Sequence, residues 1–202
     1  MADAEAKLPN ESEINVKGQS VNNIQADTVN VRYGQTGDIK ANSVVVSQAG
    51  AAHVEGSTVE LRQAGAQTVK GYNVNIRQGG VVEAKAENLS ITQGGIVFAE
   101  TKEANLTASG AGAILASGDV VLDQSMAKAI LTRGEVKMDQ SGSGVVLAQR
   151  VSTGSNTGVV LLIAGRVDGP VNAVFGPAAS AAFGAAFALV IGLIWWLRSR
   201  LA

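Results

Sequence analysis

The sequence predicts an all-β fold, a single-chain β-solenoid followed by one C-terminal transmembrane α-helix. Three observations predict it: a fifteen-residue repeat of aliphatic positions, a composition of small side chains, and a charge-free apolar run near the end. The 202 residues include 24 glycines, no cysteine and only 4% aromatic residues. Small side chains suit the narrow interior of repetitive β-structure, whereas a compact globule of this length would bury more aromatic bulk.

The repeat is visible where residues 54–68, VEGSTVELRQAGAQT, are aligned with residues 69–83, VKGYNVNIRQGGVVE. Two aliphatic columns recur two residues apart with polar residues between them, which indicates one half-buried strand per repeat. The first column is Ile14, Val29, Val44, Val59, Val74, Leu89 and Ala104, continuing after a one-residue slip as Val120, Val136, Val151 and Val167. The second is Val16, Val31, Val46, Leu61, Ile76, Ile91, Leu106, Leu122 and Met138.

A strand at a fixed short period with glycine-rich corners is typical of a β-solenoid. We expect about ten to eleven coils of 15–16 residues over residues 14–176, stacked at the strand spacing into a rod of roughly 50 Å. Residues 1–13 would be a flexible polar N-terminus, residues 177–197 a transmembrane helix and residues 198–202 a short basic tail.

A column of glutamines follows the second aliphatic column, and glycines follow the glutamines two residues later. Stacked side-chain amides can hydrogen-bond along the rod, so we interpret this column as a structural ladder rather than a ligand site. We expect the glycines to adopt the unusual φ of the corner or to permit close approach of neighbouring coils. The ladder residues are Gln48, Gln63, Gln78, Gln93, Gln124 and Gln140.

One outward column changes from charged to apolar residues along the chain. It is charged from Lys40 to Glu100 and then continues as leucine, with the flanking residues also turning apolar. A continuous apolar run indicates a strand covered on both sides. The cover could be a second copy, a lipid surface or the C-terminal segment; alternatively, the coil geometry changes and the leucines turn inward. The predicted interface residues are Leu115, Leu131, Leu147 and Leu162.

Residues 178–197, AASAAFGAAFALVIGLIWWL, contain no charge and would span about 30 Å as a helix, the thickness of a bilayer core. Trp195 and Trp196 match an interfacial aromatic belt, with Arg198 and Arg200 beyond it. Small residues at every fourth position form a ridge that would favour helix association in the membrane. This ridge comprises Ser180, Gly184, Ala188 and Gly192.

Two features of the sequence predict opposite orientations of the span in the membrane. The polar, acidic start of the sequence has no export signal, so a single span at the C-terminus predicts a tail anchor with a cytoplasmic solenoid. The positive-inside rule, applied to Arg198 and Arg200, favours the reverse orientation. Because five residues can cross despite two charges, we expect the solenoid in the cytoplasm.

No catalytic, cofactor-binding or metal site is expected. His53 falls at a variable coil corner, where a solvated histidine is the simpler interpretation. Asp123 and Asp139, with Asp119 and Glu135 nearby, could gather a hard cation, but their spacing differs from that of calcium-binding β-rolls. The net charge of -1 gives no reason to expect nucleic acid, and no motif indicates a small-molecule substrate.

The loop-free, cysteine-free repeat over residues 14–170, combined with a membrane segment, resembles the bactofilins, bacterial cytoskeletal β-helix proteins that form polymers. The resemblance implies a scaffold that assembles without nucleotide. Bactofilins often carry a short N-terminal membrane-targeting stretch, whereas the apolar segment of this chain is C-terminal and long enough to span.

The sequence therefore predicts a membrane-anchored, non-enzymatic scaffold that self-associates or docks a partner through the leucine column. Its expected partners are the lipid bilayer and either further copies of the chain or a membrane-complex protein. One alternative is an accessory subunit that anchors a larger membrane complex. A second is an exported, adhesin-like binding module, since secreted adhesins also use β-solenoids.

Overall fold

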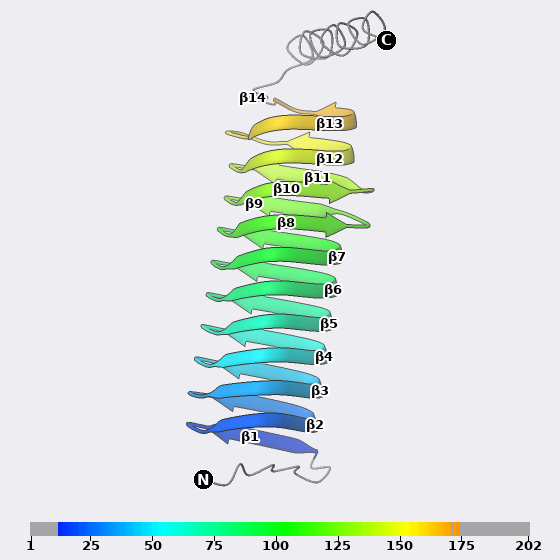
Figure 1. Cartoon of the computed structure of the whole chain (residues 1–202). Helices are drawn as coiled ribbons and strands as arrows, with labels where there is room; N and C mark the ends of the chain where they lie inside the picture. Colours follow the sequence, from blue (N-terminus) through cyan, green and yellow to red (C-terminus); the bar gives the residue numbers. More distant parts are fainter. Residues whose placement is uncertain (1–11, 171, 174–202) are drawn as a thin grey trace, which may run out of the picture.

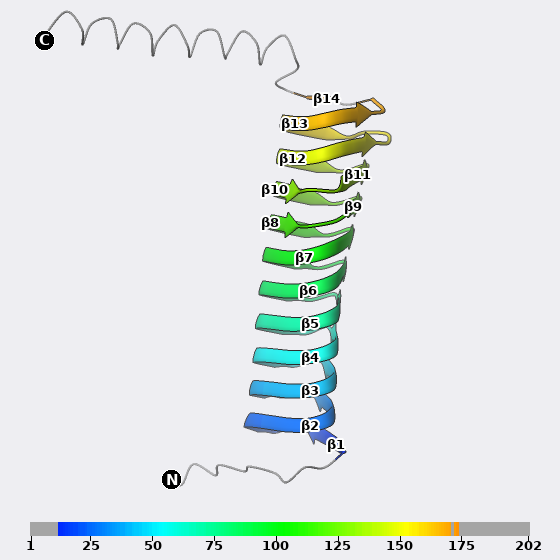
Figure 2. The same cartoon turned by 90° about the vertical axis from the view of Figure 1, so that its right-hand side faces the viewer.

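The chain forms a straight rod of stacked parallel strands in the computed structural model, which describes residues 12–170 and 172–173 (Figures 1 and 2). Every strand pairs in parallel with the equivalent strand of the neighbouring coil, so the β-solenoid of about ten coils is confirmed. The strands are β1 (Glu13–Lys17), β2 (Ser20–Arg32), β3 (Gln35–Ser47), β4 (Gly50–Arg62), β5 (Gly65–Arg77), β6 (Gly80–Thr92), β7 (Gly95–Thr107), β8 (Gly110–Ala116), β9 (Val120–Asp123), β10 (Met126–Thr132), β11 (Glu135–Asp139), β12 (Gly142–Thr153), β13 (Gly158–Asp168) and β14 (Asn172–Ala173).

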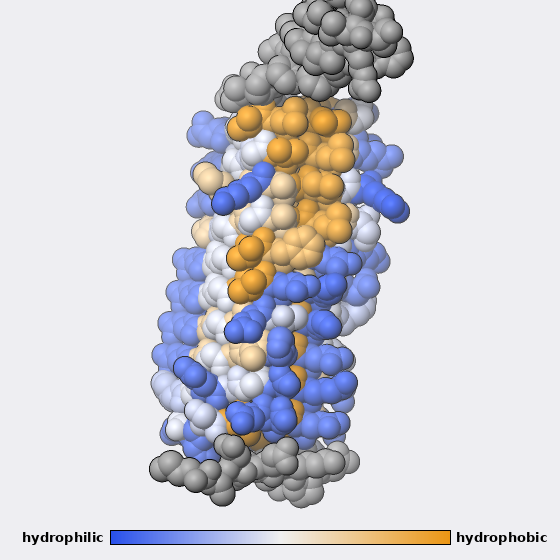
Figure 3. Space-filling model, viewed as in Figure 1, coloured by the Kyte–Doolittle hydropathy of each residue, from blue (hydrophilic) through white to orange (hydrophobic). Residues whose placement is uncertain are grey.

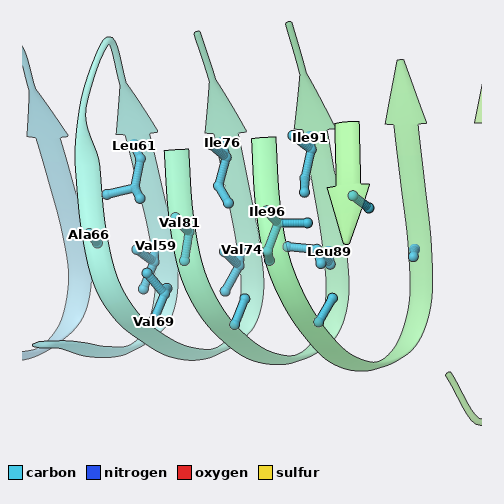
Figure 4. Close-up of a cluster of buried hydrophobic side chains, with 14 of the residues drawn as sticks. Val59, Leu61, Ala66, Val69, Val74, Ile76, Val81, Leu89, Ile91 and Ile96 are labelled. Atoms are coloured by element: carbon cyan, nitrogen blue, oxygen red, sulfur yellow. The ribbon is translucent and has the colours of Figure 1, made fainter. Parts of the chain in front are cut away.

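Each coil is flattened into two layers, because a long strand such as β5 bends halfway along its length (Figure 4). Ala66 and Val69 point inward from its first half, and Val74 and Ile76 point inward from its second half. All four side chains are buried. The interior is thus only two short side chains thick, which explains why the sequence can build it with so few aromatic residues.

Both predicted aliphatic columns are confirmed by the strand register. Val59 pairs with Val74 and Leu61 pairs with Ile76, and the same correspondence holds along the rod. Val167 is in register with Val151 but remains 44% exposed. Within the described residues only the two-residue strand β14 lies beyond β13, so this last coil lacks a complete neighbour above it.

The one-residue slip of the repeat is an extra residue at the bend between the layers. Thr101 pairs with Ala116 across fifteen residues, whereas Ala104 pairs with Val120 across sixteen. The bend therefore separates β8 from β9. The carboxylate of Asp119 lies at this bend and accepts a hydrogen bond from the backbone N–H of Glu135 at 2.9 Å, which satisfies a donor outside the strand ladder.

The corner geometry corrects the expectation about the glycines. The left-handed φ belongs to the glutamine at most corners, with values of 50° at Gln48 and 54° at Gln78, and to Gly18, Tyr33, Ala108 and Asn156 at the others. Among the described glycines only Gly18 and Gly169 have a positive φ. A glycine two residues after the glutamine, such as Gly80, does not supply the turn.

The amide ladder is confirmed over four coils. The side-chain amide of Gln48 donates to Gln63 at 3.0 Å, and the same bond joins Gln63 to Gln78 and Gln78 to Gln93 at 3.2 Å each. Ala108 follows Gln93 in this column and has no amide to continue the series. In the described part of the chain, Gln124 and Gln140 keep the left-handed φ without an amide bond between their side chains.

No helix long and apolar enough to span a membrane occurs within the described residues. The apolar segment 178–197 lies outside them, so Ser180, Gly184, Ala188, Gly192, Trp195, Trp196, Arg198 and Arg200 remain sequence predictions.

Candidate assembly surface

The outward column that changes character is a straight row of side chains along one layer of the rod. In register, the charged residues end at Glu100, and Leu115, Leu131 and Leu147 follow. The three leucines are 44%, 41% and 42% exposed, so they point away from the core. The alternative in which the leucines turn inward is therefore wrong for these three residues.

Leu162 does not belong to this column. It pairs with the buried Val146 and packs against the core, whereas Ile163 pairs with Leu147 and is 53% exposed. The shift arises at the preceding corner, because Met138 pairs with Thr153 across fifteen residues but Gly142 pairs with Gly158 across sixteen. The leucine column (Leu115, Leu131, Leu147 and Ile163) thus ends in isoleucine.

A second apolar column lies two residues before the first, on the same side of the sheet. From β8 onward its members are in register with one another, two alanines followed by larger side chains: Ala113, Ala129, Val145 and Leu161. The exposed Phe98 of β7 precedes Ala113 in this column. Figure 3 shows the result as a hydrophobic area over the upper coils of this layer. The apolar face is defined here as the leucine column (Leu115, Leu131, Leu147, Ile163) and the graded column (Ala113, Ala129, Val145, Leu161).

The same layer is hydrophilic in the N-terminal half of the rod (Figure 3). Lys40 contacts Glu55 at 3.4 Å, and Lys85 contacts Glu100 at 3.0 Å, so these charges pair along the rod axis. The hydrogen bond from Lys85 to Glu100 raises the pKa of the lysine. These groups are exposed, and removing them from water would be costly. One flat surface therefore combines a hydrated half and an apolar half.

The opposite layer carries charge instead. Arg62 donates to Glu60 at 2.8 Å and Arg77 lies 3.8 Å from the same carboxylate. The hydrogen bond from Arg62, with the charges of both arginines, lowers the pKa of Glu60 despite its partial burial. In the C-terminal half this layer presents Lys137 and Asp139. The broad apolar surface is thus confined to one side of the rod.

The residues weighed for chemistry do not converge on a site. His53 is exposed and stacks between Asp38 and Thr68. In the described ranges no three or more histidine, aspartate or glutamate residues lie close enough to hold a metal ion. Asp139, like Asp119, has a structural contact, since it accepts a hydrogen bond from the backbone N–H of Ser155 at 2.9 Å.

Sequence reasoning missed a buried hydroxyl column directly after the glutamine corner. The backbone N–H of Ser109 donates to the hydroxyl of Ser125, and that of Ser125 donates to the hydroxyl of Ser141, each at 3.1 Å. Each of these serine hydroxyls also bonds a carbonyl two residues earlier. The signal was present as serine recurring at a spacing of sixteen, in a position that holds Ala64 or Gly79 in earlier coils.

Comparisons of the chain with protein-family models, with curated proteins and with solved structures found no match.

Proposed function

We propose that this chain is a non-enzymatic scaffold whose rigid rod carries an assembly surface, the apolar face, and is held at a membrane by residues 178–197. The observation that supports this most directly is the contiguity of the apolar face. Four exposed aliphatic side chains follow one another along the leucine column, with the graded column beside them. Contiguous apolar patches on soluble surfaces are uncommon and often functional, because burying them releases free energy.

The architecture favours a structural role over catalysis. Neighbouring coils join through short corners, and the register of one coil is the register of the next. Such a surface repeats chemistry at the strand spacing and offers a partner a flat, regular platform. Bactofilin-like polymer-forming scaffolds combine the same architecture with assembly, which is the finer identity that we propose for this chain on architecture alone.

The position of the apolar face fits the proposed anchor. The face occupies β8, β10, β12 and β13, the coils nearest to the C-terminal segment. In the proposed arrangement residues 178–197 cross the bilayer and the solenoid lies on the cytoplasmic side. The assembly surface would then lie close to the membrane, where anchoring raises the local concentration of any partner that is also bound to the membrane.

The anchor is tested by expressing the full chain and a chain that ends at residue 176. We expect the full chain in the membrane fraction and the shorter chain in the soluble fraction. Protease added to intact cells should leave the solenoid uncut if it is cytoplasmic. Recovery of both chains in the soluble fraction would contradict the anchor.

The assembly surface is tested on the full chain extracted in mild detergent. Its native size is compared with that of L131K/L147K and of N105K/T107K, a control that replaces two exposed residues of the opposite layer. We expect a complex larger than the monomer that is lost only in L131K/L147K, because lysines in the face would have to be desolvated. A complex insensitive to L131K/L147K would contradict the assigned surface.

A further inference from the structure

The apolar face has a gradient of side-chain size that bears on what can cover it. The leucine column is nearly uniform, whereas the graded column grows from alanine at Ala113 to leucine at Leu161. The distance between the main-chain planes of two packed sheets depends on the side chains at each level, and is about 10 Å in proteins. A cover that follows this face must therefore compensate the gradient.

Two copies packed face to face with their rods parallel would not compensate it. Each coil would meet its own equivalent, so both alanines of the Ala113 level would lie together at one end and both leucines of the Leu161 level at the other. The gap between the sheets would be wedge-shaped. Continuing the overlap would also bring Lys70 and Lys85 against their own copies, with like charges opposed.

Two antiparallel copies compensate the gradient at every level. With a two-fold axis between the levels of Leu131 and Leu147, Leu115 of one copy faces Ile163 of the other. In the graded column Ala113 then faces Leu161, and Ala129 faces Val145. In this column every level pairs alanine with a larger side chain, and the leucine column is nearly uniform, so the two sheets can keep one spacing.

The antiparallel overlap also avoids burying charge. The four levels of the face reach the last long strand, β13, so the partner's described coils end close to the level of Glu100. The hydrated half of each rod, from Lys40 to Lys85, then projects beyond the overlap with its axial ion pairs in water. If two antiparallel copies overlapped along the full length of the rods, the leucines of one copy would instead lie against the charged residues of the other.

We infer that the apolar face is a homodimer interface in which two copies of this chain overlap antiparallel through β8, β10, β12 and β13. The inference rests on the proposed function and names its partner as a second copy; because the two C-terminal ends leave the overlap at opposite ends, both rods would lie along the membrane surface. The face covers only four coils and lies below the size of a standard protein interface, so the dimer should be reversible at micromolar chain concentrations.

The absence of cysteine from the chain makes the arrangement testable with single introduced cysteines. Full-length L115C and I163C, each with a different fusion tag, are purified in mild detergent, mixed and treated with a bifunctional thiol cross-linker that spans less than about 10 Å, because facing residues of two packed sheets are too far apart for a direct disulfide. We expect a cross-link between L115C and I163C and none between two L115C chains, because three strand spacings, about 14 Å, would separate the latter pair along the rods. K40C serves as an exposed control on the hydrated half and should not cross-link to itself.

Light scattering of cysteine-free chains gives an independent measure. We expect L131K to raise the dissociation constant at least about tenfold, since its lysine would be buried against Leu147 of the second copy. N105K adds the same charge at an exposed residue of the opposite layer and should leave the constant unchanged. Circular dichroism of both variants shows whether the solenoid is intact.

Each other outcome overturns the inference. Cross-linking of L115C to itself would establish a parallel pair. A monomer at every concentration would exclude the homodimer. If no self-association occurs but L131K still disrupts a complex with a different protein, the homodimer is wrong while the proposed scaffold function stands.

Discussion

At most coil corners the residue with left-handed φ is glutamine, although glycine lies two residues away. Gln78 has φ of 54° and its amide bonds Gln63 and Gln93 above and below it. The amide bonds offset part of the steric cost that a side chain has in this conformation. Gly79 is needed for a different reason, because a Cβ there would lie 2.2 Å from the carbonyl oxygen of Ala64.

Two adjacent glycines should therefore respond oppositely to alanine. We expect Gly79→Ala to destabilise the rod by about 1–3 kcal/mol, because backbone must move to accept the methyl group. Gly80→Ala meets no atom within 4 Å and should be neutral or stabilising by up to about 1 kcal/mol through the unfolded chain. Denaturant unfolding measures both. Equal losses in the two variants would contradict the corner geometry.

Glu60 should make a small pH-dependent contribution to stability. Its folded pKa is lowered below the ordinary value of 4.5 by Arg62, so the contribution is present above that value and is lost as pH falls through the folded pKa. Because the pair is at the surface and screened by solvent, we expect less than about 1 kcal/mol. The stability difference between wild type and Glu60→Gln, measured from pH 7 down to pH 3, should shrink toward zero. A difference that grows on acidification would reverse the assigned sign.

At the scale of the element, the later coils differ from the earlier ones at both of their turns. The bend between the layers gains a residue that divides the strand into β8 and β9, and the corner gains buried hydroxyls at Ser109 and Ser125. These additions leave the apolar columns in register, since Ala104 still stacks under Val120. The insertion at the bend is accommodated because the inward aliphatic columns lie in the strands on either side of it.

The hydroxyl column should contribute to stability through one specific bond. Ser125→Ala would leave the buried N–H of Ser109 without its acceptor, at an expected cost of about 1–3 kcal/mol. Ser125→Thr should be much closer to wild type, because Thr157 occupies the equivalent place two coils later. Denaturant unfolding compares the two. Alanine and threonine variants of equal stability would show that this bond contributes little.

On the scale of the whole molecule, the rod is a one-dimensional stack in which each coil contacts its neighbours alone. The hydrated and apolar halves of one layer therefore depend on separate sets of coils. Stability should be approximately a sum over coils and their contacts. Removing a coil from the hydrated half ought to shorten the rod and leave the apolar face as it was.

Deletion of residues 65–79 tests this independence. It joins Ala64 to Gly80 in register and removes one complete coil, β5 with its corner. We expect a folded rod shorter by about 4.8 Å, with self-association unchanged. Small-angle X-ray scattering measures the length and light scattering the association. Deletion of residues 65–78, which removes one residue fewer, is the control and should disturb the register at the junction.

The sequence by itself determined the solenoid and its core. Aliphatic residues alternate with polar ones at a fixed period, and a one-residue error would turn a whole column to the other side of the sheet. The two aliphatic columns and the amide ladder could therefore be predicted, from Val59 and Leu61 to Gln48. The outward column was predictable as far as Leu147, because the aliphatic columns reveal the change of spacing from fifteen to sixteen residues before that point.

Only the tertiary structure decided the geometry of the segments in which aliphatic and polar residues do not alternate. It showed that Ile163 and not Leu162 ends the leucine column, because the extra residue lies in a corner without alternation to mark it. It showed that glutamine rather than glycine carries the left-handed φ. It also joined the graded column to the leucine column as one face. Which side chains are exposed, and which of them face one another across the two layers, depends on how each strand bends. The bend is set by the stacking of the coils and cannot be read from a single repeat.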